Sequence, residues 1–276
     1  MTAILEARGI SYRYPGTSAD ALHELSLQIP MGKKTAICGH NGSGKSTFFL
    51  HTIGIHKPAK GSLLWKGSEI SYKRESIQRL RRQIGLVFQD PEQQLILNTP
   101  LEDVSFGLRN AGVSEQEINE RTAAILSVMG LSELSDTPIH QLSLGQKKRV
   151  ALAGVLVLEP DLLILDEPTA YLDRVSEQQL IEELNRIHSR GIGMVMATHD
   201  MNLAYSWADW ILVMDRGSCV LQGTPEYVFG RGDQLHDLGL ELPMLLDLWR
   251  SLPEHVRAGQ APPRDLAAFK QLIEKL

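Results

Sequence analysis

The stretch Gly39-His40-Asn41-Gly42-Ser43-Gly44-Lys45-Ser46-Thr47 decides how the rest of the chain is interpreted. It matches the pattern G-x-x-x-x-G-K-[ST] at every fixed position. Its three glycines let the backbone turn tightly and bring N–H groups against phosphate oxygens without a Cβ in the way. The Lys45 ammonium can face the β- and γ-phosphates of a nucleotide, and the Ser46 hydroxyl can ligate Mg²⁺. The stretch therefore predicts a nucleotide-binding loop in preference to a structural turn rich in glycine.

The segments on either side of this loop agree with that prediction. The apolar run at 35–38 indicates a buried parallel strand, and residues 47–55 indicate a helix. A helix that begins at the loop adds a partial positive charge beneath bound phosphates. The order strand, loop, helix is the one that an α/β nucleotide site requires.

The composition narrows the class of protein. The chain has 276 residues and a formal net charge of −5, which argues against non-specific binding of nucleic acid. Its two cysteines, Cys38 and Cys219, give neither a disulfide framework nor metal-ligand spacing, and they fit a reducing cytoplasm. The N-terminus shows no signal-peptide pattern, and the longest apolar run, residues 150–158, is too short to span a bilayer. We therefore expect a soluble protein that reaches a membrane only through partners.

The order of predicted elements divides the chain into three parts. The first ninety residues mix antiparallel strands and hairpins with the nucleotide-binding strand and helix. Residues 90–160 indicate a helical insertion, with capping boxes that begin at Thr99, Ser114 and Ser143. After about residue 230 the chain changes to a Gly-rich linker and then to apolar residues at helical spacing, which end at Leu276. A basic run at 73–82 is expected to be a solvated helical face.

Polar residues that follow apolar strands form a second group of candidates. The run 162–165 ends in Asp166 and Glu167, where Asp166 can hold Mg²⁺ and Glu167 can act as a general base toward water. Gln89 and His199 each end another predicted strand, and they can ligate Mg²⁺ and hold the attacking water, respectively. Taken singly, each of these is also explained as a solvated strand end.

The stretch Leu142-Ser143-Leu144-Gly145-Gln146 opens a helix whose N-terminus is a possible second anion site. A plain capping box explains the same residues. A second anion site on a chain with one phosphate loop becomes meaningful if two chains pair, so that each helix covers the γ-phosphate bound by the other.

Together these motifs give the chain a specific resemblance. Over residues 4–230 it is similar to the ATP-binding cassette (ABC) ATPases: residues 39–47 resemble the Walker A motif, Gln89 the Q-loop, 142–146 the LSGGQ signature and 162–167 Walker B. Leu172-Asp173 and His199 resemble the D-loop and the switch histidine, and Tyr14 stands where the family stacks an aromatic ring on adenine. The resemblance implies an α/β fold: a P-loop, RecA-like core with an antiparallel β subdomain, an inserted helical subdomain at about 90–160, and a small C-terminal helical extension over 231–276 that serves dimerisation.

The same resemblance implies a head-to-tail homodimer that sandwiches two ATP molecules with Mg²⁺. Its catalytic residues would be Glu167, His199, Lys45 and Gln89. Its Mg²⁺ ligands would be Ser46, Gln89 and Asp166. Its ATP contacts would be Tyr14, Gly39, Asn41, Gly42, Ser43, Gly44, Lys45, Ser46, Thr47, Ser143, Gly145, Gln146 and Asp173.

Within that family, the stretches 88–94 and 145–151 look like those of energy-coupling-factor importers, and most like the cobalt-type ATPase subunit CbiO. Such a system implies a transmembrane coupling protein (CbiQ-like), a substrate-specific membrane component (CbiM-like, with CbiN) and no nucleic acid. The ATPase would lie at the cytoplasmic face of the membrane, held there by these partners. Nickel or a vitamin as cargo, a soluble ABC ATPase and a non-hydrolysing scaffold subunit are the alternatives.

Two residues depart from the family pattern. Leu144 replaces the middle glycine of the signature, and Tyr171 stands where a small residue usually precedes the D-loop. Leu144 adds a bulky side chain near the expected phosphate, and Tyr171 bears on the communication between the two sites. The nine histidines do not cluster at metal-ligand spacing, so we expect the cargo ion to be selected by the membrane component rather than by this chain.

Overall fold

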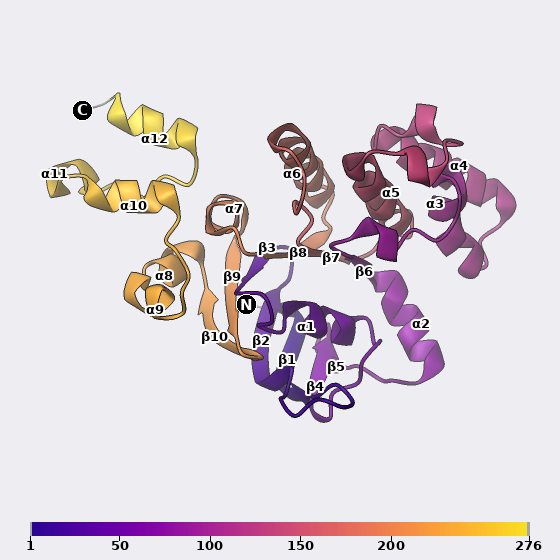
Figure 1. Ribbon diagram of the computed structural model, residues 1–276, viewed down its shortest axis with the longest axis horizontal. Helices are drawn as coiled ribbons and strands as arrows, with labels where there is room; N and C mark the ends of the chain where they lie inside the picture. The colour runs from indigo at the N-terminus through magenta and orange to yellow at the C-terminus, as the bar shows by residue number, and fades with distance from the viewer. Residues whose placement is uncertain (1, 275–276) are drawn as a thin grey trace. The chain divides into compact units, whose positions relative to one another are not determined.

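The computed structural model describes residues 2–274, so that Leu276, the last apolar residue of the predicted tail, lies outside the described part. The described chain forms two compact units. The first comprises residues 2–45, 59–67 and 198–274, and the second comprises residues 46–58 and 68–197. Figure 1 labels the helices and strands of both units.

The first unit contains the antiparallel strands predicted for the start of the chain. Strand β1 (Ala3–Tyr12) pairs antiparallel with β2 (Leu22–Pro30) on one side and with β4 (Lys60–Trp65) on the other. Buried and exposed residues alternate along β2, as expected of a sheet with one face in the core. The largest buried side chains of this sheet include Leu5, Ile10 and Leu25, each with no exposed surface.

The strand that leads into the phosphate loop also belongs to the first unit. Strand β3 (Lys34–Cys38) pairs parallel with β9 (Trp210–Asp215), and its last four residues are buried. Strand β10 (Ser218–Gly223) pairs antiparallel with β9 across a tight turn at Arg216 and Gly217, whose φ angles are both positive. The predicted buried strand at 35–38 is confirmed.

Helices complete the first unit after residue 200. They are α7 (Met201–Trp207), α8 (Pro225–Phe229), α9 (Gly232–Asp237), α10 (Met244–Ser251), α11 (Glu254–Arg257) and α12 (Leu266–Ile273). The linker predicted at 230–232 is wrong, because Gly230 caps α8 and Gly232 already begins α9. The cause is tertiary packing: Leu235 is fully buried, and its burial draws the chain directly into another helical turn.

The C-terminal helices are joined to earlier elements of the same unit by directional bonds. The Met244 N–H donates to Oδ1 of Asn202 in α7 at 2.8 Å, and the Arg264 guanidinium donates to the carbonyl oxygens of Tyr205 and Ala208. The tail therefore packs on the helix that follows residue 199, rather than forming a core of its own.

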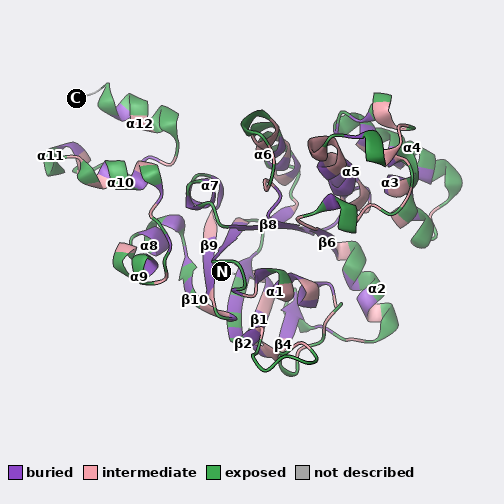
Figure 2. Cartoon of the chain, viewed as in Figure 1, coloured by how far each residue is buried: buried purple, intermediate pink, exposed green. Residues whose placement is uncertain are grey.

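The second unit is built on three parallel strands. Strand β7 (Leu162–Asp166) lies between β6 (Ile84–Val87) and β8 (Gly193–Thr198), and it pairs parallel with both. Every residue of these three strands is buried (Figure 2). Continuous apolar runs are typical of parallel strands covered on both faces, and the runs at 84–88 and 162–165 follow that rule.

Helix α1 (Lys45–Thr52) begins two residues earlier than predicted and ends three residues earlier. It ends early because the chain turns at Gly54, which has a φ of 66°. The short strand β5 (Ser68–Glu69) and helix α2 (Arg74–Gln83) follow. The basic face of α2 is not only solvated, since Arg81 donates to the Ile53 carbonyl at 2.9 Å and Arg82 donates to the Ala111 carbonyl at 3.2 Å. These bonds correct the expectation from the basic run.

Helices dominate residues 91–156. They are η1 (Pro91–Gln93), α3 (Pro100–Asn110), α4 (Glu115–Val128), η2 (Ser132–Leu134), η3 (Ile139–Gln141) and α5 (Leu144–Leu156), followed after β7 by α6 (Arg174–His188). Helix α3 packs against both α4 and α5, and the three lie side by side in Figure 1. Thr99, Ser114 and Ser143 each accept a backbone N–H as N-caps, and Pro100 occupies the first turn of α3. The reciprocal bond of a complete capping box is present at Ser143.

None of the helices in residues 2–274 combines the length and the hydropathy of a transmembrane span.

Candidate active site

The phosphate loop turns through backbone conformations that favour glycine. Gly39 has a φ of 149° and Gly44 a φ of 103°, and both approach other backbone segments closely. A Cβ at Gly39 would lie 2.2 Å from the carbonyl oxygen of Met214, and a Cβ at Gly44 would lie 2.8 Å from that of Ala21. Gly39 and Gly44 are therefore required by the fold as well as by a ligand.

Two polar side chains of the loop are buried. The Lys45 ammonium donates to the carbonyl oxygens of Gly39 at 2.7 Å and His40 at 3.0 Å. The Ser43 hydroxyl oxygen is buried and has no hydrogen-bond partner among the described residues. A buried hydroxyl without a partner costs free energy, and a phosphate oxygen would supply the missing acceptor. The loop thus has the donors and the cradle that a nucleotide phosphate needs.

The loop also contacts the C-terminal part of its own unit. A ring nitrogen of His40 lies 2.9 Å from the carbonyl oxygen of Leu238, directly after α9. This contact between a variable position of the phosphate loop and the tail has no counterpart in the motif pattern, and sequence reasoning did not anticipate it.

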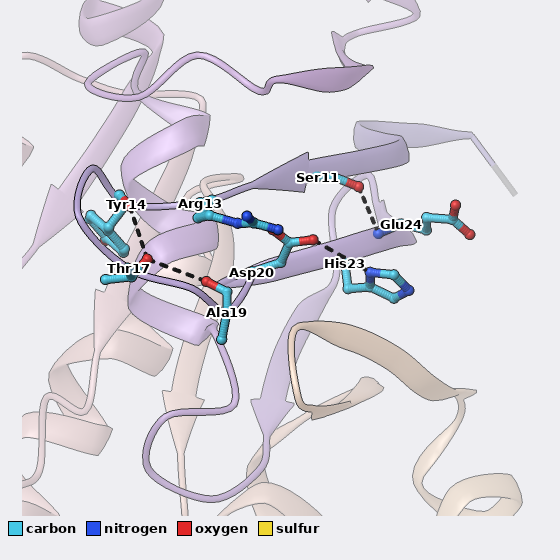
Figure 3. A network of polar contacts seen from close by, with 8 residues as sticks. All are labelled: Ser11, Arg13, Tyr14, Thr17, Ala19, Asp20, His23 and Glu24. Atoms are coloured by element: carbon cyan, nitrogen blue, oxygen red, sulfur yellow. Dashed lines mark hydrogen bonds and ion pairs between the residues drawn. The ribbon is translucent and has the colours of Figure 1, made fainter.

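Tyr14, the predicted adenine contact, follows β1 in a loop held by a network of polar bonds (Figure 3). The Thr17 hydroxyl donates to the Tyr14 carbonyl at 2.9 Å, and Arg13 donates to Asp20 at 2.7 Å. The Tyr14 ring packs edge-on against Tyr12, with the ring centroids 5.1 Å apart. These bonds fix the backbone on both sides of Tyr14, so that its ring has a defined place at the end of the strand.

His199 belongs to the first unit, comes directly after the last residue of β8 in the chain, and is exposed. Its neighbour Asp200 caps α7 by accepting the N–H groups of Asn202 at 2.8 Å and Leu203 at 3.1 Å. The Asp200 N–H in turn donates to the Thr198 hydroxyl at 3.0 Å. His199 therefore lies directly before α7, in a segment that these bonds order.

In the second unit, Asp166 and Glu167 stand at the carboxyl end of β7, each 8% exposed. Glu167 has a φ of 43°, in the left-handed region that non-glycine residues rarely occupy, and its N–H donates to the Ala197 carbonyl at 3.1 Å. Strain of this kind is concentrated at functional sites. The Gln89 amide donates to the Glu167 carboxylate at 3.3 Å, so the structure brings these two predicted catalytic residues together.

The signature segment caps α5 with a complete capping box. The Ser143 hydroxyl accepts the N–H of Gln146 at 3.3 Å, and the Gln146 side chain accepts the N–H of Ser143 at 2.8 Å. Ser143 and Gly145 also line a polar hollow of about 360 Å³ beside Leu172 and Ser176. The predicted capping box is confirmed. Ser143 and Gly145, on either side of Leu144, are accessible from this hollow.

The D-loop segment is ordered by Asp173, which accepts the N–H groups of Val175 and Ser176 at 3.0 Å as the N-cap of α6. These bonds and the Ser176 hydroxyl lower the pKa of the Asp173 carboxyl. Tyr171 has a φ of 63° and its side chain is 83% exposed. A left-handed backbone explains why a small residue is usual at this position, and the exposed ring explains how a tyrosine is accommodated.

Sequence reasoning missed a group of residues that join α5 to its surroundings. Lys148 donates to the carbonyl oxygens of Pro168 and Ala170, Lys147 pairs with Glu92 at 2.6 Å, and Gln94 donates to the Ala151 carbonyl at 3.1 Å. A lysine on a helix is usually solvated, so no spacing signal marked Lys148.

Comparison with known proteins supports the interpretation of these residues as a nucleotide site. The family described as ABC transporter matches residues 22–170. An energy-coupling factor transporter ATP-binding protein EcfA from Carboxydothermus hydrogenoformans is 37% identical, with 100% of this chain and 99% of that protein covered. The cobalt import ATP-binding protein CbiO of Rhodobacter capsulatus is 40% identical, with 97% of each covered. The structure of cbiO1 from Clostridium perfringens, described as part of the ABC transporter complex cbiONQ, has a TM-score of 0.76 and 41% identity, and the match covers 91% of this chain and all of that one.

The strand topology, the glycine-lined phosphate loop and the capped signature helix thus occur in a chain that is similar to these proteins over nearly its full length. The chain belongs to the ATP-hydrolysing subunits of ABC transporters, in the energy-coupling-factor group that includes EcfA and CbiO.

Proposed function

We propose that this ATPase hydrolyses ATP by in-line attack of a water molecule that Glu167 activates. The observation that carries the proposal is the hydrogen bond from the Gln89 amide to the Glu167 carboxylate, 3.3 Å long, at the end of a fully buried strand. A neutral donor orients the carboxylate without neutralising it, which is what a general base needs. The left-handed backbone at Glu167 supports the same role.

The phosphate loop binds the nucleotide in this proposal. Its glycine cradle and the buried Ser43 hydroxyl hold the phosphates, and Lys45 moves from the carbonyl oxygens of Gly39 and His40 to the β- and γ-phosphates. Exchanging neutral acceptors for charged ones strengthens the bonds of the ammonium. Tyr14 stacks on the adenine, and His199 holds the attacking water.

The proposed Mg²⁺ ligands are Ser46, Gln89 and Asp166. All three offer oxygen atoms, from a hydroxyl, an amide and a carboxylate, and this hard donor set fits Mg²⁺. When bound, Mg²⁺ supplies positive charge against the β- and γ-phosphates.

A second copy completes each site. We propose that Ser143 and Gly145 of one copy face the γ-phosphate held by the other copy, through the free N–H groups at the start of α5. Leu144 lies between these two residues in the chain. The capping box between Ser143 and Gln146 fixes the backbone of this segment. Asp173 stays with its own α6 and orders the segment between the two sites.

The chain is the ATP-binding subunit of an energy-coupling-factor importer, and the proposed cargo is cobalt ions. The similarity to a cobalt import ATP-binding protein over 97% of both chains supports this cargo. Its partners would be a CbiQ-like coupling protein and a CbiM-like substrate component with CbiN, and it would be held at the cytoplasmic face of the membrane. A groove of about 260 Å³ in the second unit, lined by Ile53, Ile55, Leu86 and Phe88, is an apolar surface suited to a helix of the coupling protein.

Reconstitution tests both parts of the proposal. The subunit would be purified with the membrane proteins that accompany it, inserted into liposomes, and supplied with ATP on its own side. We expect ATP-dependent uptake of Co²⁺ and none with Glu167→Gln. Uptake of Ni²⁺ or of a vitamin in place of Co²⁺ would overturn the cargo but not the ATPase, whereas full hydrolysis by Glu167→Gln would overturn the role of Glu167.

A further inference from the structure

Lys148 is a buried cation whose ammonium bonds to two neutral acceptors. Its side chain lies on α5, five residues after the cap Ser143, and the residue is only 4% exposed. The ammonium donates to the carbonyl oxygens of Pro168 at 2.7 Å and Ala170 at 2.9 Å. A buried lysine that bonds to backbone rather than to a carboxylate is uncommon, because a buried charge is costly to desolvate.

The two acceptors lie in the segment that follows the proposed base. After Glu167 the backbone turns, with the Ala170 N–H donating to the Glu167 carbonyl at 3.1 Å and the Leu172 N–H donating to the Thr169 carbonyl at 3.2 Å. Two further carbonyl oxygens of the turn, those of Pro168 and Ala170, accept hydrogen bonds from the Lys148 ammonium. The ammonium therefore adds two hydrogen bonds to this turn, and without it two acceptors lose their donor.

The neighbouring residue joins the same helix to a different loop. Lys147 pairs with Glu92 in η1 at 2.6 Å, shortly after Gln89, and Glu92 is largely exposed. Consecutive lysines on α5 thus reach two segments: Lys147 the one after Gln89, and Lys148 the one after Glu167. Of the two, Lys148 makes its contact in the interior.

We propose that Lys148 is a positioning residue that holds the start of α5, with Ser143 and Gly145, in register with the turn that follows Glu167. This inference rests on the proposed function, in which Ser143 and Gly145 serve the ATP of a second copy while Glu167 serves the ATP of its own chain. Lys148 then connects the two half-sites of one chain, so that a movement of the turn after Glu167 is passed to the signature.

The charges around Lys148 agree with this role. Burial lowers the pKa of Lys148 to about 8, and the negative charges of Asp90 and Glu167 act in the opposite direction. Both carboxylates belong to the segments that the two lysines join to α5.

The experiment compares Lys148→Met, Lys148→Arg and Lys147→Met in the full-length subunit. Methionine keeps the length and apolar stem of lysine but removes its donors. Arginine keeps donors and has room, because Lys148 borders the hollow of about 360 Å³. We expect Lys148→Met to bind a fluorescent ATP analogue within twofold of the native chain, while its kcat falls about ten- to a hundredfold, the usual effect of a displacement of about 1 Å at a catalytic site. Lys148→Arg should restore most of kcat, and Lys147→Met should change it less than threefold.

Three results would contradict the positioning role of Lys148. A folded Lys148→Met with kcat within twofold of the native value overturns the inference, as does a loss of analogue binding as large as the loss of kcat. If Lys148→Met does not fold, a Lys148→Arg variant that folds but turns over no faster than a tenth of the native rate also overturns it. Glu167→Gln is measured alongside: normal hydrolysis in that variant refutes the proposed function, whereas its inactivity with a normal Lys148→Met refutes only the role of Lys148.

Discussion

Substituting Gly39 by alanine tests whether the phosphate loop is shaped by a close backbone approach. An alanine Cβ would lie 2.2 Å from the Met214 carbonyl oxygen and 2.8 Å from the Ser43 hydroxyl, well inside van der Waals contact. The backbone oxygen cannot rotate away, so β9 or the loop must shift. Overpacking of this kind costs about 1–3 kcal/mol. Holding alanine at a φ of 149° adds about 1–3 kcal/mol of backbone strain.

Gly42→Ala is the matched control, because Gly42 lies in the same loop with a φ of 82° and a Cβ added there would meet no atom within 4 Å beyond its chain neighbours. Its cost is the left-handed strain of about 1–2 kcal/mol, partly offset by about 0.4–1 kcal/mol from a less flexible unfolded chain. We expect Gly39→Ala to lower the free energy of unfolding by about 2–5 kcal/mol and Gly42→Ala by about 1 kcal/mol or less.

The assay is urea unfolding of both variants without nucleotide, followed by tryptophan fluorescence, so that stability is separated from ligand binding. A difference between the two variants of less than about 0.5 kcal/mol would refute the argument, since both share the positive φ and differ in the contact with Met214. ATP binding is then measured at a temperature where both variants are folded. Gly39→Ala should bind more weakly than Gly42→Ala, because the displaced backbone carries the donors to phosphate.

Three further results are expected. Glu167→Gln should keep ATP binding and accumulate an ATP-bound dimer with hydrolysis reduced by about a hundredfold or more, measured by size-exclusion chromatography and phosphate release. At Tyr171, whose φ is 63°, valine should be less stable than glycine by about 1–2 kcal/mol in urea unfolding, because a β-branched residue is strained there. Burial raises the pKa of Cys38 to about 12 and that of Cys219 to about 11, so at about pH 8 both thiols stay protonated in the native chain. Iodoacetamide should modify them only after unfolding, and rapid native labelling would contradict this.

Much of this fold can be predicted from short stretches of sequence, because the backbone geometry of those stretches depends on residues close together in the chain. The glycines of the phosphate loop, the caps at Thr99, Ser114 and Ser143, and the apolar run at 162–165 each specify a backbone geometry within a few residues, and the structure has all of them. The linker expected at 230–232 failed for the opposite reason. Burial of Leu235 is a tertiary effect, and it overrides the flexibility that glycine suggests.

By itself, the sequence determined the chemistry of this protein: a phosphate loop, two acids after a buried strand, and a capped helix with the signature pattern. Those motifs name residue types at short spacings, which is why they can be found without a structure. Only the tertiary structure decided which of these residues meet. It put the Gln89 amide on Glu167, the Met214 carbonyl against Gly39, and the Lys148 ammonium on the turn after Glu167. Each of these contacts joins segments far apart in the chain, and their geometry is set by packing rather than by local pattern.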